Sequence, residues 1–193
     1  MMKTAWQQAG NTLLCLVSVV LLGPGLLAGE PEAAGEELAS VLDAVPPETP
    51  ADGQALCRRI AEGGRDRIAT LADLLVDPNE RVDDERDHKA RYLLHGLAMY
   101  VAGPEGRDHR QAFVGAVTAA LAKDKPKPVT RYLLQQLQYS GGCSDETLKA
   151  LTPLLHDADL AGAAVRTILM SAGEGDRVVA LFRNALNGTK GRP

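Results

Sequence analysis

The sequence repeats one helical pattern at a nearly constant spacing, and this repeat limits the fold more than any other feature. Residues 91–94 (Arg-Tyr-Leu-Leu) are matched by residues 131–134, forty positions later, and by residues 166–169 (Arg-Thr-Ile-Leu) after thirty-five more. A period of this length that holds two helices is typical of stacked hairpins, which bury their apolar faces against their neighbours. The segments between these motifs repeat three apolar positions at offsets of 34 and then 31: Val114, Val117 and Leu121; Leu148, Leu151 and Leu155; Val179, Phe182 and Leu186.

Helix-breaking residues divide the same region into eight predicted helices. Apolar residues at helical spacing are interrupted by Gly, Pro or acidic loops. We expect Asp52 and Ser144 to cap two of these helices. Gly63 and Gly64 are expected to end the first helix in a left-handed turn, and Pro128 to open another, because a first-turn residue needs no N–H. The predicted helices cover residues 52–62, 65–76, 84–102, 107–123, 128–140, 145–156, 157 or 159 to 171, and 176–187.

One stretch carries a recognisable repeat motif. Residues 154–159 (Leu-Leu-His-Asp-Ala-Asp) end a predicted helix in an acidic turn, and residues 164–166 (Ala-Val-Arg) follow in the next helix. Residues 74–77 (Leu-Leu-Val-Asp), with Ala90 and Arg91, repeat this order across a longer turn. The pattern resembles that of HEAT repeats, and the chain is similar in this respect to secreted bacterial HEAT-repeat proteins.

The resemblance implies an all-α fold, specifically an α-solenoid of about four HEAT-like hairpins between residues 52 and 187. It also implies a scaffold that binds proteins or peptides along the surface of its second helices, and it brings no catalytic residues. A plain helical bundle with coincidental spacing is the alternative fold.

The N-terminal segment, residues 1–29, has the layout of a signal peptide. Lys3 precedes an apolar run over residues 12–22, which Gly-Pro-Gly then ends. Cleavage after Ala28 or Gly29 predicts an exported protein, periplasmic or extracellular. The alternative is an uncleaved segment that anchors the chain in a membrane, although the run is short compared with the roughly 20 residues of a spanning helix.

The segments that flank the repeats differ from them in composition. Residues 30–51 are rich in Glu, Ala and Pro, which predicts an acidic spacer with a short helix over residues 36–43. Residues 188–193 are interpreted as a tail or as a linker to further repeats.

Charge and cysteine content restrict the partners and the cross-links. The formal net charge of −4 leaves no broad basic surface for phosphates, so we expect no nucleic-acid partner. Cys57 and Cys143 lie two repeats apart, well beyond the roughly 7 Å between Cα atoms that a disulfide tolerates, so we expect no bridge.

The chain shows no motif for catalysis, for a cofactor or for a metal. His88 and His95 are seven residues apart, which separates them by about 10 Å along a helix, too far to ligate one ion. The acidic loop over residues 77–87 lacks the ligand order and the glycine of a calcium loop. No serine lies in a nucleophile elbow, and no glycine-rich loop binds phosphate. We therefore predict no enzyme activity and no cofactor.

The leading interpretation is a non-catalytic, exported scaffold that binds a protein or peptide. Its predicted partner groove is lined by cations on the second helices. The alternatives are an accessory module of a larger exported enzyme or electron-transfer protein, and a membrane-tethered adaptor. The predicted groove residues are Arg65, Lys149, Arg177 and Arg183.

Overall fold

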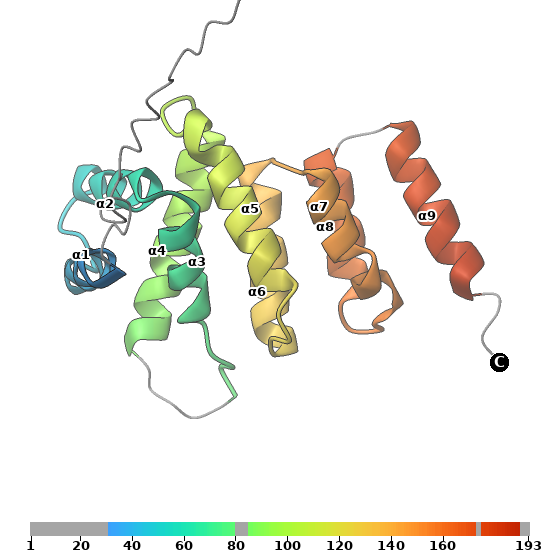
Figure 1. The fold of residues 1–193 in the computed structure, drawn as a ribbon, viewed down its shortest axis with the longest axis horizontal. Coiled ribbons are helices and arrows are strands. Elements are labelled where there is room, and N and C mark those ends of the chain that lie inside the picture. The colour runs from blue at the N-terminus through green and yellow to red at the C-terminus, as the bar shows by residue number, and fades with distance from the viewer. Residues whose placement is uncertain (1–30, 80–84, 173–174, 190–193) are drawn as a thin grey trace, which may run out of the picture.

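The computed structural model describes residues 31–79, 85–172 and 175–189, and within these ranges it contains helices and no strands (Figure 1). The all-α prediction is therefore confirmed. Two short 3₁₀ turns, η1 (Arg107–His109) and η2 (Pro153–His156), accompany the α-helices. The α-helices are α1 (Pro31–Asp43), α2 (Pro50–Glu62), α3 (Gly64–Asp73), α4 (Glu85–Ala102), α5 (Arg110–Leu121), α6 (Lys127–Ser140), α7 (Asp145–Leu151), α8 (Ala161–Ala172) and α9 (Asp176–Thr189).

The helices contact one another in an alternating order. Helices α2, α4, α6 and α8 pack in succession, and we call them the first layer. Helices α3, α5 and α7 pack in succession beside them and form the second layer, which faces the viewer in Figure 1. Sequence neighbours from α1 to α6 and from α7 to α9 also contact one another, and a continuous core of buried side chains runs between the layers. Helix α9 contacts α8 and η2 at the far end.

Burial defines which positions of the first-layer helices are equivalent. Leu93, Leu94 and Leu97 of α4 are fully buried, and so are the residues forty positions later on α6. Between α6 and α8, however, the buried positions match at an offset of 34. The predicted offset of 35 is wrong there, because it would pair the buried Leu134 with Leu169, which is 48% exposed. The matched buried residues of α6 and α8 are Val129, Thr130, Leu133 and Leu134, and Ala163, Ala164, Thr167 and Ile168.

The second helices follow their predicted pattern as far as α7. Val114 and Val117 of α5, like Leu148 and Leu151 of α7, are buried. Val179 of α9 is 54% exposed, although its predicted equivalents are buried. The neighbouring Val178 turns inward instead, so the register of α9 differs by one residue from the sequence alignment.

The stretch predicted as a spacer is part of the folded core. Helix α1 is longer than the predicted short helix, and Leu38, Val41, Leu42 and Val45 from this stretch are buried in the core. Three of these residues, Leu38, Val41 and Leu42, lie at helical spacing on α1 and are enough to bury one of its faces, whatever the average composition of the segment.

An arginine holds α1 against the two helices that follow. Arg67 of α3 forms an ion pair with Glu37 of α1, and it donates a second hydrogen bond to the carbonyl oxygen of Arg59 at 2.7 Å. The Arg67 side chain crosses over Gly63, where an added Cβ would lie 2.2 Å from the Arg67 Nε. Gly63 is therefore required for space, since its φ of −71° is ordinary.

Helix ends confirm some of the predicted caps and correct others. Ser144 caps α7 and Gly141, at a φ of +65°, ends α6, as the sequence predicts. Helix α2 begins earlier than predicted. Its cap is Thr49, and Asp52 completes the capping box from the third helical position. The left-handed residue after α2 is Gly64, which already belongs to α3.

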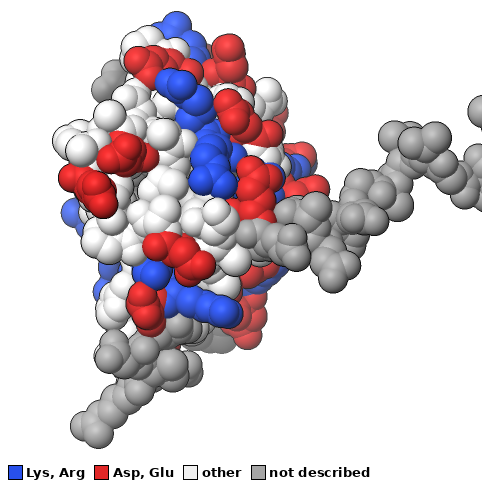
Figure 2. Space-filling model, turned by 90° about the vertical axis from the view of Figure 1, so that its left-hand side faces the viewer, with Lys and Arg blue, Asp and Glu red and all other residues white. Residues whose placement is uncertain are grey.

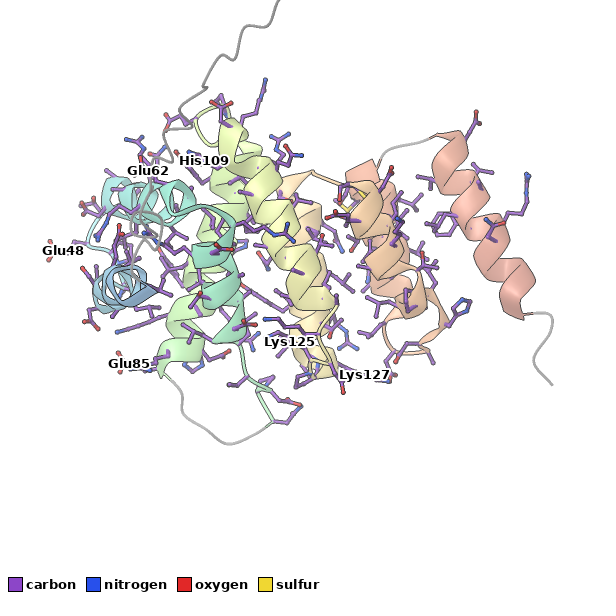
Figure 3. The ribbon with its side chains drawn as sticks, viewed as in Figure 1. Glu48, Glu62, Glu85, His109, Lys125 and Lys127 are labelled. Carbon is purple, nitrogen blue, oxygen red and sulfur yellow. The ribbon has the colours of Figure 1, made fainter. Side chains whose placement is uncertain are left out.

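Ion pairs connect successive turns along one edge of the molecule. Lys125, in the turn before α6, lies with its Nζ 3.2 Å from a carboxylate oxygen of Asp73 at the end of α3. Lys127 reaches the turn before α8, with its Nζ 3.0 Å from Asp157 and 2.5 Å from Asp159. Figure 3 shows both lysines at this edge. These ion pairs join the end of α3 to the turn before α6, and the start of α6 to the turn before α8.

Several predictions concern other parts of the chain. No disulfide joins Cys57 to Cys143, both of which the structure describes. The predicted signal peptide, residues 80–84 of the acidic loop, and residues 190–193 of the tail lie outside the described residues. Over residues 31–79, 85–172 and 175–189, no helix combines the length and the apolar character needed to cross a membrane.

Candidate binding surface

Exposed apolar side chains gather on one side of the first layer. In the described part of the chain, six large apolar side chains are exposed, and five of them lie on α4, α6 and α8. A surface helix normally turns polar side chains to water, so such a concentration on three adjacent helices is a candidate binding surface. The five are Tyr92 and Met99 on α4, Tyr139 on α6, and Leu169 and Met170 on α8.

We call the surface that contains these side chains the outer face. It also includes the exposed polar residues between them on the same three helices. Its members are Tyr92, His95, Met99, Arg131, Gln135, Tyr139, Arg166, Leu169 and Met170.

The burial register arranges the outer face in rows that cross the helices. An offset of forty places Met99 of α4 level with Tyr139 of α6, and His95 level with Gln135. An offset of 34 then places Gln135 level with Leu169 of α8. The outer face is therefore continuous across three helices.

Polar and aromatic contacts connect α4 to α6 on this surface. The rings of His95 and Tyr139 meet edge to face, with their centroids 5.1 Å apart. The His95 Nδ1 lies 3.3 Å from the Oε1 of Gln136, and the Gln135 amide donates to the Tyr139 hydroxyl at 2.9 Å. These contacts orient the exposed Tyr139 ring.

A cleft of about 340 Å³ lies beside Tyr92 and Met99, between α2 and α4. Two glycines leave room for it. A Cβ at Gly96 would lie 3.0 Å from the Cys57 Sγ, and a Cβ at Gly53 would lie 3.7 Å from the Tyr92 hydroxyl. The cleft is lined by Pro50, Gly53, Gln54, Cys57, Tyr92, Gly96, Met99 and Tyr100.

The thiol of Cys57 lines this cleft and is held in its neutral form. Its side chain is buried, and desolvation raises its pKa from an ordinary 9.0 to about 11. A thiol with a raised pKa is a poor nucleophile at neutral pH. The cleft is therefore suited to binding an apolar group, and Cys57 supplies an apolar part of its wall.

This shift predicts a loss of stability in alkali. Between pH 9 and pH 11 the unfolded chain ionises Cys57 while the folded chain keeps the proton, so stability falls as the pH rises. At pH 10 we expect a loss of about 1.4 kcal/mol relative to pH 7 from this group alone. Urea unfolding of the wild type and of Cys57→Ala at both pH values isolates the effect. Equal losses in the two proteins would contradict the raised pKa.

The outer face lacks negative charge. No Asp or Glu follows Asp87 on α4, and none occurs on α6 or α8. Asp87 itself is buried in an ion pair with Arg91. Arg131 and Arg166 are exposed, and no carboxylate in the described part of the chain pairs with either of them. A chain with a net charge of −4 thus presents a cationic and apolar surface here.

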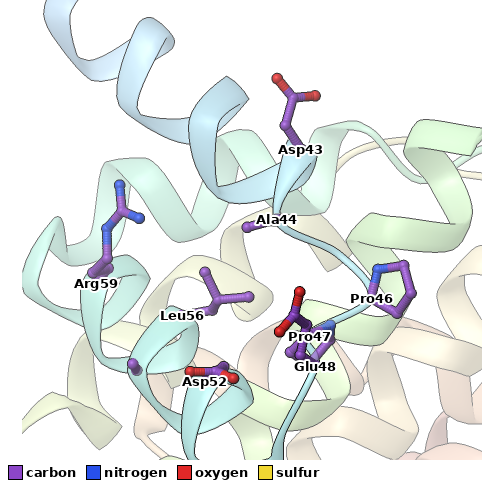
Figure 4. Close-up of a pocket in the computed structure, with 9 residues that line it drawn as sticks. Asp43, Ala44, Pro46, Pro47, Glu48, Asp52, Leu56 and Arg59 are labelled. Atoms are coloured by element: carbon purple, nitrogen blue, oxygen red, sulfur yellow. The ribbon is translucent and has the colours of Figure 1, made fainter.

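The other cavities are more polar and lie at the α1 end. The larger one, of about 550 Å³, follows the linker between α1 and α2 and holds Asp43, Glu48, Asp52 and Arg59 among its lining residues (Figure 4). Asp52 is already engaged in the α2 capping box. Figure 2, a view of this end, shows charges of both signs dispersed around uncharged surface. A second cavity, of about 440 Å³, lies between α1, α3 and α4.

The predicted groove residues are spread along the molecule. Arg65 lies on α3 with its guanidinium against Gly115 of α5, and Lys149 is exposed on α7. Arg183 is exposed on α9, at the opposite end of the molecule from α3 (Figure 1). The side chain of Arg177 lies outside the described residues. The described cavities are lined by other residues.

The sequence did not predict the outer face as a binding surface, although several of its residues belong to the repeated motif. Tyr92 belongs to the repeated motif, whose apolar residues are expected to be buried, but its side chain is exposed. Met99 and Tyr139 follow that motif at the same distance in two repeats, forty residues apart. A search for large apolar residues at equivalent positions outside the buried face would have found them.

Metal-binding side chains do not cluster in the described ranges, where no group of three His, Cys, Asp or Glu residues is placed to hold an ion. Comparison of the chain with protein-family models, with curated proteins and with solved structures finds no match.

Proposed function

We propose that this chain is a non-catalytic scaffold of HEAT-like helical hairpins that binds a protein or peptide on its outer face. The observation that carries the proposal is the row of exposed apolar side chains on α4, α6 and α8. Exposed Tyr, Met and Arg side chains are typical of the centres of protein interfaces.

Contacts between equivalent helices support an α-solenoid arrangement. The Arg91 guanidinium of α4 stacks 5.0 Å above the Tyr132 ring of α6, whose hydroxyl donates to the Arg91 carbonyl oxygen at 2.5 Å. The hydroxyls of Thr118 and Thr147 join α5 to α7 at 2.9 Å. Thr167 of α8 donates to the carbonyl oxygen of Leu134 on α6 at 3.2 Å. Each hairpin is thus bonded to the next, as a stack of repeats requires.

The outer face is the better candidate of two surfaces. The cations predicted to form a groove lie on the opposite layer or on α9, and their charge alone offers a partner little apolar contact. Burial of apolar area is the main favourable term in most protein association. The outer face combines exposed aromatic rings with an adjacent cleft, which can hold an apolar anchor from a partner.

A peptide selection tests the proposed function. We expect the full chain to enrich a set of related sequences from a random phage-displayed peptide library. The triple variant Tyr92→Ser, Met99→Ser, Tyr139→Ser should lose that enrichment, because truncation of exposed anchors removes contact area without disturbing the core. Thermal unfolding should show that the variant still folds and unfolds cooperatively.

The matched control carries substitutions on the second layer. Arg65→Glu with Lys149→Glu should retain the enrichment. Loss in this control but not in the triple variant would move the binding surface to the second helices. Absence of any enriched sequence in the wild type would refute the scaffold proposal.

Export is the proposed location. It is supported by the apolar run over residues 12–22 and the Gly-Pro-Gly that follows. N-terminal sequencing of the protein produced in its native host tests this proposal. A start near residue 30 supports export, whereas an intact Met1 supports the membrane-anchored alternative.

A further inference from the structure

We propose that the partner of the outer face is an acidic peptide segment, bound in extended form, with apolar side chains spaced about three residues apart. This inference rests on the proposed function, since it names the class of ligand that the same surface would take.

Charge selects an acidic ligand. Over α6, α8 and the part of α4 that follows Asp87, basic side chains occur without any carboxylate. Arg131 is exposed on α6, where it donates to the Asp159 carbonyl oxygen at 3.3 Å, and Arg166 is exposed on α8, one turn before Leu169 and Met170. Complementary charge speeds association and rejects ligands of the wrong sign. A basic segment would meet two unpaired guanidinium groups with no compensating carboxylate.

The spacing of the helices selects the apolar pattern. Packed helices lie about 8 to 10 Å apart. An extended chain in the polyproline II conformation advances about 3.1 Å per residue and returns every third side chain to the same face. A peptide that crosses the first layer therefore moves from one helix to the next in about three residues. Apolar anchors would lie in the cleft beside Met99, against the Tyr139 ring, and over Leu169 and Met170.

The scarcity of cations argues against other anionic partners. Membrane attachment through anionic lipid takes clusters of about four to eight basic residues. Nucleic-acid affinity likewise depends on neutralising many phosphates. The outer face offers Arg131 and Arg166 within a chain that is negative overall, which suits a few carboxylates with defined positions.

Three nine-residue fluorescent peptides test the inference with the full chain by fluorescence anisotropy. The first has Leu or Phe at its second, fifth and eighth positions and Asp or Glu elsewhere. The second replaces the acidic residues with Lys, and the third replaces the apolar residues with Ser. We expect the first peptide to bind at least about tenfold more tightly than either of the others, a difference of about 1.4 kcal/mol. Its binding should weaken as NaCl is added, because salt screens exposed charges.

The variant Arg131→Glu with Arg166→Glu should weaken the acidic peptide at least about tenfold and favour the Lys peptide, because the sign of the surface is reversed. Both side chains are exposed, so folding should be retained, as circular dichroism can verify. The control Lys149→Glu with Arg183→Glu makes the same charge change away from the outer face and should leave the affinity unchanged.

The possible outcomes separate the two proposals. Equal or tighter binding of the Lys peptide, lost in the triple variant of the apolar residues, would overturn the acidic preference and leave the scaffold intact. Tighter binding to vesicles of anionic lipid than to the acidic peptide would also overturn it. Binding of none of the three peptides overturns the inference, and the phage selection then decides whether the scaffold proposal survives.

Discussion

Replacing Phe113 with alanine should be among the most destabilising single substitutions in this protein, at about 4 kcal/mol. Phe113 is the largest of the fully buried side chains and lies on α5, which contacts both neighbouring second-layer helices. Its loss removes the transfer free energy of a ring and leaves a cavity that rigid neighbours cannot fill. In a chain of this size the Tm should fall by about 10 °C. Urea unfolding and calorimetry measure the two quantities.

The chain offers a matched control, because it has one other phenylalanine. Phe182 of α9 is half-buried and packs against the edge of the core. Phe182→Ala should cost about 1 to 2 kcal/mol, in proportion to the smaller area that it removes from contact. If Phe182→Ala were as costly as Phe113→Ala, α9 would pack more tightly than its few neighbours indicate, and the position of the core would need revision.

The helix ends show what local sequence can predict. Ser144 accepts a hydrogen bond from a first-turn N–H, and Gly141 adopts a left-handed conformation that other residues resist. Both effects act within a few residues, so both were predicted correctly. At α2 the cap is Thr49, and Asp52 completes the capping box from the third helical position, so the prediction that Asp52 is the cap was wrong by three residues.

Tertiary packing explains where the prediction failed. The segment before α2 is acidic and rich in proline, and this average composition predicted a spacer. It gave no indication of the buried helix face formed by Leu38, Val41 and Leu42. Similarity of residue types aligns Arg166 with Arg131, whereas the pattern of buried positions aligns Arg166 with Tyr132. The sequence of one helix does not determine which of its sides faces the neighbouring layer, because that depends on the position of the neighbouring helices.

The same limit applies to the candidate site. The prediction of a groove used charge, which indicates that a side chain is exposed but not that several side chains converge. Its four residues lie on three helices, α3, α7 and α9. The outer face depends on which large apolar residues remain uncovered. Tyr92 and Leu93 are adjacent in sequence and both have large apolar side chains, yet Tyr92 is 50% exposed and Leu93 is fully buried. Only the packing of α4 against α2 and α6 distinguishes them.

Removal of the Asp87 carboxylate should destabilise the protein by about 3 kcal/mol. One oxygen of Asp87 accepts the Val76 N–H at 3.0 Å, and the other accepts the Arg91 Nε at 2.7 Å. Arg91 closes the ring by donating to the Val76 carbonyl oxygen at 2.8 Å. Asp87→Ala leaves a largely buried guanidinium without its carboxylate and a backbone N–H without its acceptor, and both changes are costly.

Glu85 provides the control for this prediction, since it pairs with Lys89 one helical turn away, just as Asp87 pairs with Arg91. The two carboxylates differ in exposure, at 79% for Glu85 and 8% for Asp87. Glu85→Ala should change the free energy of unfolding much less than Asp87→Ala does, because the exposed Glu85 carboxylate already interacts with water and its ion pair contributes little. Similar losses for the two variants would mean that helix position, and not burial, sets the cost.

A double-mutant cycle shows whether Asp87 acts through Arg91. The variant Asp87→Ala, Arg91→Ala should lose at least about 1 kcal/mol less than the sum of the single variants, because the second substitution removes the charge that the first leaves unpaired. Part of the Arg91→Ala cost should persist, since that side chain also stacks on Tyr132 of α6. Strictly additive losses in the free energy of unfolding would contradict this closed ring of contacts. They would mean that backbone packing stabilises the α3–α4 turn, and not Arg91, which also joins α4 to α6.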